Sequence, residues 1–131
     1  MRLLLDTHIA LWAIIDSPNL TARIRELIID PGNIITVSTV SVWEIAIKHA
    51  LARGKPTDMP ISGAEALHYF RAAGYVLLNI SPEHAAAVEQ LPDLHADPFD
   101  RLLVAQSMVE PLRLLTHDAK VAAYSDQVIL L

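Results

Sequence analysis

The sequence predicts an α/β fold in which a mainly parallel β-sheet is covered by helices on both faces. Short aliphatic or β-branched runs, which are typical of buried strands, alternate along the chain with segments whose apolar residues recur at helical spacing. Strands separated by helices imply right-handed crossovers that join parallel strands. The length of 131 residues corresponds to one domain over residues 1–131, and no repeat or linker divides the chain.

The N-terminal part of the chain contains two predicted strands and three predicted helices. In order, they are a strand over residues 3–5, helices over residues 9–15 and 21–29, a strand over residues 34–37 and a helix over residues 42–51. Pro18 ends the first helix and Pro31 ends the second, because proline cannot continue helical hydrogen bonding. Apolar residues of the third helix, such as Trp43 and Ile47, recur every three to four positions.

The C-terminal part is predicted to add four helices and three strands. In order, they are a helix over residues 62–73, a strand over 75–80, a helix from residue 82, a helix over 98–109, a strand over 112–115, a helix over 119–124 and a strand over 128–131. Ser62 and Glu65 form a capping box at the first of these helices. Ser81 precedes Pro82 at the first position of the second helix, and a loop over residues 91–96 precedes the third.

The composition excludes several classes of protein. With 53% hydrophobic and 19% charged residues, the chain is not intrinsically disordered, and without cysteine it has neither disulfides nor a cysteine-ligated metal site. The apolar run at residues 3–5 is shorter than the core of a secretory signal, and the longest uncharged run, residues 31–43, is too short to span a bilayer. We therefore expect a soluble, cytoplasmic protein with no membrane partner.

Four short motifs place carboxylates beside apolar residues. They are LLLDTH at residues 3–8, SVWEIAIK at 41–48, DPFDR at 97–101 and LLTHD at 114–118. Asp6 directly follows a predicted strand, and Asp118 lies three residues after Leu115, just past another strand. Ligands of open parallel sheets bind beyond the carboxyl ends of the strands, so these acids stand where functional carboxylates are expected.

Each acid also has a purely structural interpretation. Asp6 can cap the helix that follows it. Glu44 can pair with Lys48 one turn later, although its apolar neighbours predict a buried carboxylate that needs a partner or a metal. Asp97 and Asp100 together make a competent start for a helix with proline at its first position. Asp118, the acid of the LLTHD motif, can be an ordinary loop residue.

Considered together, the acids predict a cation site. Carboxylates that converge on one pocket cannot all stay ionised without a cation. Oxygen ligands without cysteine select hard cations such as Mg²⁺ or Mn²⁺. A Mg²⁺ ion held by few carboxylates keeps several waters, which suits it to bind a phosphate and to activate a water. The expected chemistry is therefore phosphodiester hydrolysis.

In this order and spacing, the motifs resemble those of the PIN-domain ribonuclease family, and within it the VapC-type toxins of type II toxin–antitoxin modules. The resembling segments are the opening strand with DTH and residues 37–48, 94–107 and 114–124, which together cover nearly the whole chain. The resemblance implies a PIN-like three-layer α/β/α sandwich with a five-stranded sheet. It also implies a Mg²⁺-dependent endoribonuclease, in which Mn²⁺ can substitute.

The resemblance further implies the site residues and the partners. Asp6, Glu44, Asp100 and Asp118 would be catalytic and would ligate the metal, with Asp97 beside them as a further ligand. The implied partners are an RNA substrate, a second copy of the chain in a homodimer, and a VapB-type antitoxin that wraps over the toxin and inserts a basic residue among the acids.

Residues adjacent to the motifs have competing interpretations. Thr7, Ser38 and Thr116 could orient carboxylates or phosphate oxygens, but we favour ordinary hydrogen bonds to the local backbone. His8 and His117 follow motif residues, and we interpret both as structural. No paired ligand spacing is present among the six histidines of the chain.

Basic residues near the acids are candidate phosphate contacts. They are Lys48, Arg53, Lys55, Arg101 and Lys120. For Arg53 and Lys55 we favour solvated surface charges. No basic patch with interleaved aromatic residues appears, so no base specificity can be read from the sequence.

Two other functions stay open at this stage. The first is a non-catalytic, PIN-like protein that only binds a partner, although every acidic position of the cluster is filled. The second is a Mg²⁺-dependent phosphatase. A haloacid-dehalogenase phosphatase would have Asp-x-Asp after its first strand, whereas Thr7 and His8 follow Asp6. The acidic pair that a response-regulator receiver carries after its first strand is also missing.

The net charge of −5 is consistent with an RNA substrate once the cluster is considered separately. Of the 15 acids, five belong to the suspected cluster, and the remaining ten equal the number of lysines and arginines. The charge thus describes one concentrated metal site on an otherwise balanced protein. We expect RNA affinity to be modest and to depend on the metal.

Overall fold

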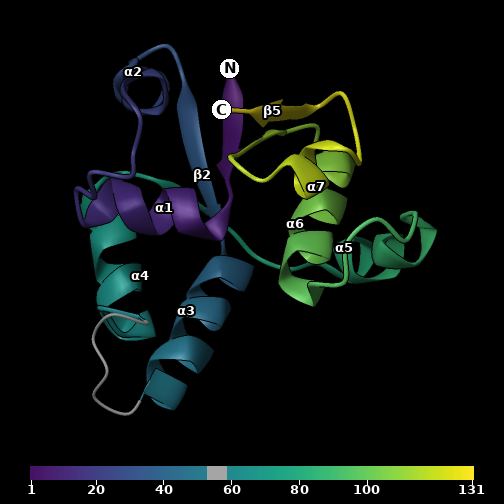
Figure 1. Ribbon diagram of the computed structural model, residues 1–131, viewed down its shortest axis with the longest axis horizontal. Helices are drawn as coiled ribbons and strands as arrows, with labels where there is room; N and C mark the ends of the chain where they lie inside the picture. Colours follow the sequence, from purple (N-terminus) through teal and green to yellow (C-terminus); the bar gives the residue numbers. More distant parts are fainter. Residues whose placement is uncertain (53–58) are drawn as a thin grey trace.

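The structure is a computed structural model that describes residues 1–52 and 59–131. Five strands form one sheet in the order β3-β2-β1-β4-β5, and every neighbouring pair is parallel. The strands are β1 (Arg2–Leu5), β2 (Ile34–Ser38), β3 (Val76–Leu78), β4 (Arg113–Thr116) and β5 (Val128–Leu130). The expected α/β class and the five-stranded sheet are confirmed, and the sheet is parallel throughout (Figure 1).

Seven α-helices and one 3₁₀ turn connect the described strands. They are α1 (Thr7–Ile14), α2 (Ala22–Ile29), α3 (Thr39–Ala52), α4 (Gly63–Ala72), α5 (Pro82–Ala87), the 3₁₀ turn η1 (Val88–Gln90), α6 (Pro98–Val109) and α7 (Ala119–Ala122). Each predicted helix is present. None of the helices in the described part of the chain is long and apolar enough to cross a membrane.

Helix starts are where the prediction was least accurate. Helix α1 begins two residues and α3 three residues before the predicted starts, since each follows its strand almost directly. The hydroxyl of Ser38 accepts a hydrogen bond from the backbone N–H of Val40 at 3.0 Å, so α3 is stabilised from the last residue of β2. Strand β3 is shorter than predicted and pairs with β2 alone among the described strands.

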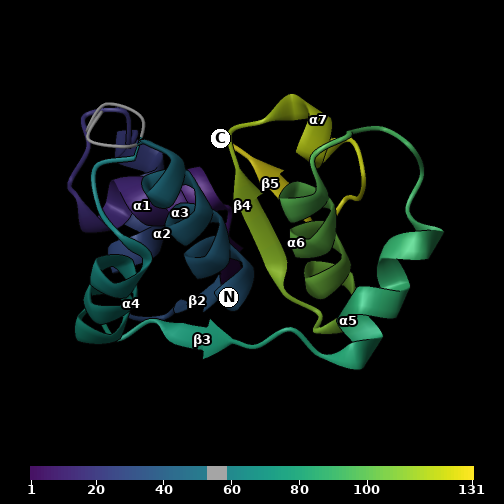
Figure 2. The ribbon, with the colours of Figure 1, turned by 90° about the horizontal axis from the view of Figure 1, so that it is seen from below.

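Alternate residues of β1 divide the core into two layers. Leu3 and Leu5 pack in a cluster with residues of α1, α2 and α4, while Leu4 packs in a second cluster with residues of α6 and α7. This alternation follows from the two-residue period of a strand. Figure 2 shows α1, α2 and α4 on one side of the sheet and α5, α6 and α7 on the other, which is a three-layer α/β/α sandwich.

The topological switch point of the sheet, where the order of successive strands reverses, lies at its centre beside β1. Strand β1 is followed by β2 on one side and is paired with β4 on the other. Just past the end of β1, the backbone N–H of Asp6 donates to the carbonyl of Leu115 in β4 at 3.0 Å. A ligand site in such a sheet is expected at this switch point, beyond the carboxyl ends of β1 and β4.

Close packing between α3 and α4 depends on Gly63 and provides a test of the fold. A Cβ added at Gly63 would lie 2.7 Å from the Cβ of Ala46 and 3.3 Å from the carbonyl of Val42. We expect Gly63→Ala to lower the free energy of unfolding by about 1–3 kcal/mol, because overpacking forces the helices apart. Urea unfolding monitored by circular dichroism measures this.

A matched substitution elsewhere controls for the change of residue type. At Gly32 an added Cβ would meet only the side chain of Asp30, with its nearest atom at 3.2 Å. That exposed side chain accepts a hydrogen bond from the backbone N–H of Gly32 at 2.8 Å and need move by only a few tenths of an ångström to make room. Gly32→Ala is therefore expected to change stability by less than about 0.5 kcal/mol. Equal stability of the two variants would contradict the close contact between α3 and α4.

Candidate active site

Asp6 stands at the point where β1 meets α1. Its side chain is buried and caps α1, since Oδ1 accepts from the backbone N–H of His8 at 2.9 Å. Oδ2 accepts from the hydroxyl of Thr116, at the end of β4, at 2.6 Å. Each carboxylate oxygen offers two lone pairs, so the capping role leaves acceptor capacity for a cation. The structural and the functional interpretations of Asp6 are thus compatible.

Glu44 contributes a buried carboxylate from α3. Its side chain is buried, and Oε2 accepts from Nζ of Lys48 at 2.6 Å, the ion pair expected from the spacing. Oε1 has no hydrogen-bond partner among the residues that the structure describes. A buried carboxylate oxygen without a partner is energetically costly, and the ion pair with Lys48 does not account for it.

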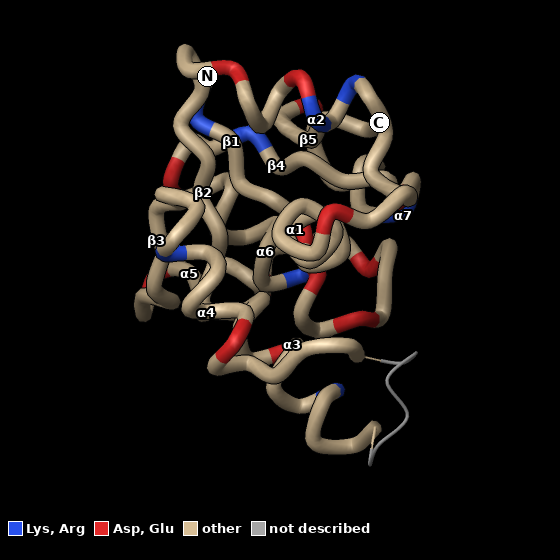
Figure 3. The backbone as a smooth tube through the Cα atoms, turned by 90° about the vertical axis from the view of Figure 1, so that its left-hand side faces the viewer, with Lys and Arg blue, Asp and Glu red and all other residues tan. Residues whose placement is uncertain are grey.

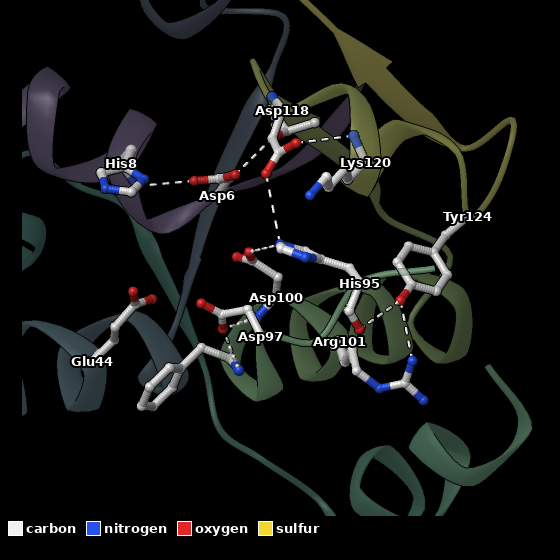
Figure 4. A network of polar contacts seen from close by, with 12 residues as sticks. Asp6, His8, Glu44, His95, Asp97, Asp100, Arg101, Asp118, Lys120 and Tyr124 are labelled. Carbon is white, nitrogen blue, oxygen red and sulfur yellow. Dashed lines mark hydrogen bonds and ion pairs between the residues drawn. The ribbon is translucent and has the colours of Figure 1, made fainter. Parts of the chain in front are cut away.

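Helix α6 presents two acids at its N-terminus. Asp97 is the N-cap, and its Oδ1 accepts from the backbone N–H groups of Phe99 and Asp100 at 2.8 and 3.1 Å. Oδ2 of Asp100 lies 2.8 Å from Nε2 of His95. Figure 4 shows the carboxylates of Asp97 and Asp100 next to each other, both facing the part of the site where Glu44 lies.

Asp118 completes the group from the opposite side. It caps α7, since Oδ1 accepts from the backbone N–H of Lys120 at 2.9 Å, and its Oδ2 lies 3.7 Å from Nε2 of His95. One ligand atom each of His95, Asp100 and Asp118 falls within 4.8 Å of the other two. This separation suits donors arranged around one cation.

These side chains surround a cavity of about 340 Å³ at the carboxyl edge of the sheet. Its lining residues are Asp6, His8, Asp100, His117, Asp118 and Ala119. Glu44 and Asp97 do not line it, but Figure 4 shows their carboxylates pointing toward Asp6 and Asp100. In Figure 3 several acidic positions, drawn red, lie in the region bounded by α1, α3 and α7. The four motifs, distant in sequence, therefore meet in one place.

The accumulated negative charge changes the acidity of Asp100. Burial, together with the negative charges of Asp97, Asp6 and Glu44, outweighs the hydrogen bond from His95 and raises the pKa of this carboxyl to about 6. A carboxyl that binds a proton so readily stands among uncompensated negative charges. A bound cation would supply the missing compensation.

The same negative charges favour the charged form of Lys48, whereas they disfavour the charged form of Asp100. Burial alone would lower the pKa of its ammonium, but the hydrogen bond and charge of Glu44 outweigh this effect. The charges of Asp97 and Asp100 contribute as well, so the pKa of Lys48 is raised. The charge of this one lysine therefore interacts with several of the acids.

The donor set fits a divalent cation. Carboxylate oxygens are the ligands that hard cations such as Mg²⁺ and Mn²⁺ prefer. Among the described residues, only Asp100 and Asp118, with His95, have ligand atoms close enough together to share one ion, whereas Asp6, Glu44 and Asp97 lie around this group. Two features of the protein favour an added positive charge, namely the unpartnered Oε1 of Glu44 and the raised pKa of Asp100. His95 offers one nitrogen beside these oxygens.

The neighbouring hydroxyls divide into two kinds. Thr116 orients acids, because its Oγ1 donates to Asp6 and accepts from the backbone N–H of Asp118 at 3.1 Å. Thr7 shares a hydrogen bond with the hydroxyl of Ser41 at 2.9 Å, and Ser38 serves α3 as described above. The preference for a local backbone role is correct for Ser38 and incomplete for Thr116.

The basic residues considered as phosphate contacts also divide into those that bind the protein itself and those that stay exposed. Arg101 donates to the carbonyls of Val88, Leu91 and Pro92 and to the hydroxyl of Tyr124, so its expected role as a phosphate contact is not supported. It instead holds the loop that carries His95, whose carbonyl accepts from Tyr124 at 3.3 Å (Figure 4). The side chain of Lys120 is exposed and stays a candidate. Arg53 and Lys55 lie outside the described residues.

Histidines carry the main corrections to the site. His8 and His117 are exposed and line the acidic cavity, which favours a role in the site over the structural interpretation. His95 cannot be identified from the sequence, because nothing local distinguishes it from the other histidines. Its only signal is its position two residues before Asp97, inside a segment that resembles the family.

The raised pKa of Asp100 predicts a pH effect on the metal-free protein. Its carboxyl titrates near 3.8 when unperturbed and at about 6 in the folded chain, so the folded state binds more protons between these values. Metal-free protein should therefore gain stability as the pH falls from 7 to 5, by about 1 kcal/mol from this group. Thermal unfolding in chelator at both pH values measures the gain.

Comparison with Asp100→Asn isolates this contribution from other titrating groups. The variant cannot take up the proton, so its gain in unfolding free energy between pH 7 and pH 5 should be smaller by about 1 kcal/mol. At pH 7 the variant should be more stable than the unsubstituted chain, since one charge of the cluster is removed. Identical pH profiles for the two proteins would contradict the raised pKa.

Comparisons with known proteins agree with this geometry. A family model of the PIN domain matches residues 3–127. A chain of the VapBC2 complex from Rickettsia felis, solved bound to a DNA fragment from their promoter, is similar at 18% identity and a TM-score of 0.71, covering 100% of this chain and 98% of that chain. A chain of DNA-bound VapBC from Salmonella typhimurium shows 12% identity, a TM-score of 0.66 and coverage of 100% and 97%. No curated protein matches the chain.

Proposed function

The chain belongs to the PIN domain family, and on this premise we propose that it is a Mg²⁺-dependent endoribonuclease, with Mn²⁺ as an alternative ion. It would hydrolyse phosphodiester bonds of RNA. The family is one of nucleases, and the acids at the carboxyl edge of the sheet are all present. The observation that carries the proposal is the buried Oε1 of Glu44, which has no hydrogen-bond partner among the described residues, beside acids whose charges help to raise the pKa of Asp100.

Each acid has a proposed role that follows from its surroundings. Asp6, Glu44 and Asp100 would hold the ion directly or through its waters, and Asp118 would complete the pocket from α7. Asp97 would bind beside Glu44 while capping α6. Thr116 keeps Asp6 and Asp118 in register through its shared hydroxyl. When bound, the ion supplies an activated water and neutralises charge on the departing oxygen.

The biological setting is proposed from the similar structures. Both are chains of VapBC complexes, so we place this protein as the VapC-type toxin of a toxin–antitoxin module, acting on RNA in the cytoplasm. Its partner would be a VapB-type antitoxin that covers the acidic cavity and places a basic residue among the acids. The toxin itself would form a homodimer.

The proposal is tested with purified protein and structured and single-stranded RNA. Chelator should abolish cleavage, and added Mg²⁺ or Mn²⁺ should restore it. A small phosphate ester, offered under the same conditions, distinguishes a phosphatase from a nuclease. Cleavage that persists in excess chelator, or turnover of the ester without cleavage of any RNA, would overturn the assignment.

A further inference from the structure

Three aromatic rings meet beside the acidic cavity, and the roles proposed above do not use them. Trp12 in α1 lies 4.7 Å from the ring of His117, between β4 and α7, and 5.9 Å from the ring of His8. The two histidine rings are 6.0 Å apart. We call these three side chains, His8, Trp12 and His117, the aromatic platform. They come from two segments more than a hundred residues apart in sequence.

The aromatic platform borders the site where a scissile phosphate would bind. His8 and His117 both line the acidic cavity together with Asp6, Asp100 and Asp118. His8 follows Asp6 by two residues, and His117 directly precedes Asp118. Figure 4 shows His8 beside Asp6. A group stacked on this platform would therefore be held next to a phosphate that contacts the acids.

Burial in the core does not explain the platform. The side chains of His8 and His117 are exposed, and Trp12 is only partly buried against the core cluster that includes Ile9 and Leu11. Large aromatic rings that stay partly exposed around a cavity are typical of ligand sites. The rings are also amphipathic, with faces that stack and edges that can hydrogen-bond.

A second cavity adjoins the platform, with His8 and Trp12 in its wall. It has a volume of about 320 Å³ and shares His8 with the acidic cavity. Trp12, Ile15 and Met59 give it an apolar wall, and Asn19 and Lys48 add polar groups. Its size lies in the range of small-ligand pockets, and its lining suits a flat heteroaromatic group.

We propose that the aromatic platform and the cavity beyond it bind a nucleobase of the RNA, adjacent to the phosphate that is cleaved. This proposal rests on the proposed ribonuclease function and adds the class of group that is recognised. Single-stranded nucleic acid is commonly held by bases stacked on aromatic side chains, and such stacking tolerates any base because every base has a π-face. Stacking on the platform would thus add binding energy without a fixed sequence preference.

Tryptophan fluorescence reports directly on this binding. The chain has two tryptophans, so Trp43→Phe leaves Trp12 as the only one. A single-stranded RNA octamer, added with Ca²⁺ in place of Mg²⁺ and shown intact afterwards on a gel, should quench this fluorescence. An abasic ribose-phosphate oligomer of equal length should not. In the matched variant Trp12→Phe, the remaining Trp43 should respond to neither probe.

Substitution measures the contribution of the platform to affinity. His117→Ala removes an exposed ring, and Trp12→Leu keeps an apolar side chain against the core. We expect each to weaken octamer binding by about 5- to 150-fold, the range found when one stacking ring is removed. In cleavage assays, KM should rise by a similar factor while kcat changes little. Circular dichroism confirms folding, and His117→Ala stays informative if Trp12→Leu is destabilised.

The outcomes separate this inference from the proposed function. Base-dependent quenching without cleavage of any RNA would leave the platform standing and reject the ribonuclease. Cleavage with no quenching, and with unchanged KM in His117→Ala, would reject the platform and keep the ribonuclease. Quenching by the abasic oligomer equal to that by RNA would also reject it.

Discussion

Replacing Asp6 with asparagine is expected to lower RNA cleavage by about 100-fold or more without unfolding the protein. Asparagine keeps the side-chain oxygen that caps α1 and accepts from the N–H of His8. Its amide can still hydrogen-bond to Thr116, whose hydroxyl is able to rotate. The substitution therefore removes the negative charge and retains the local structure. Gel-based cleavage assays in Mg²⁺, with thermal unfolding in parallel, measure both effects.

A matched substitution shows that the effect belongs to the site. Asp126 is exposed in the turn before β5, outside the acidic cavity, and Asp126→Asn removes the same charge. We expect it to cleave at the rate of the unsubstituted protein. Alanine at position 6 would remove the cap as well, at a cost of about 1 kcal/mol, which explains the choice of asparagine. Full cleavage activity in Asp6→Asn would contradict the proposed role of this carboxylate.

The fold could be predicted from sequence because its main determinants are local. The strands are short aliphatic runs bounded by turn residues, and Leu3, Leu4 and Leu5 are all buried because both faces of β1 are covered. Such a run indicates a central parallel strand. The errors concern helix starts, where a cap such as Asp6 or Ser38 decides the boundary through a side-chain geometry that periodicity does not contain.

The acids of the candidate site could also be predicted, for a topological reason. Carboxyl ends of parallel strands share one edge, so an acid after β1 and an acid after β4 must approach each other once the strands pair. No such rule applies to the loop that carries His95. Its position depends on Arg101 and Tyr124, which bind backbone carbonyls of that loop across up to 29 residues of sequence. The aromatic platform is a tertiary contact of the same kind.

The unpartnered oxygen of Glu44 predicts a reversal of relative stability on metal binding. In chelator, Glu44→Gln should raise the free energy of unfolding by about 1–2 kcal/mol, because it removes one charge from a buried acidic cluster. Lys48, whose side chain is 42% exposed, can turn to water when it loses its partner. With saturating Mg²⁺ the order should reverse, since binding at 100 times Kd stabilises the unsubstituted protein by about 2.7 kcal/mol and the variant has lost a ligand.

Thermal unfolding of the unsubstituted protein and of Glu44→Gln, each in chelator and in Mg²⁺, gives four midpoint temperatures. Their order shows whether the relative stability reverses on metal binding. A shift of about 1 kcal/mol corresponds to a few degrees in a chain of this size. Glu26→Gln is the matched control, because Glu26 forms an exposed pair with Arg23 at 3.8 Å and should change neither condition appreciably. If Glu44→Gln keeps the full Mg²⁺-induced shift, Glu44 is not a ligand. If it instead loses stability in chelator, the ion pair with Lys48 outweighs the repulsion among the acids, and the argument from uncompensated charge fails.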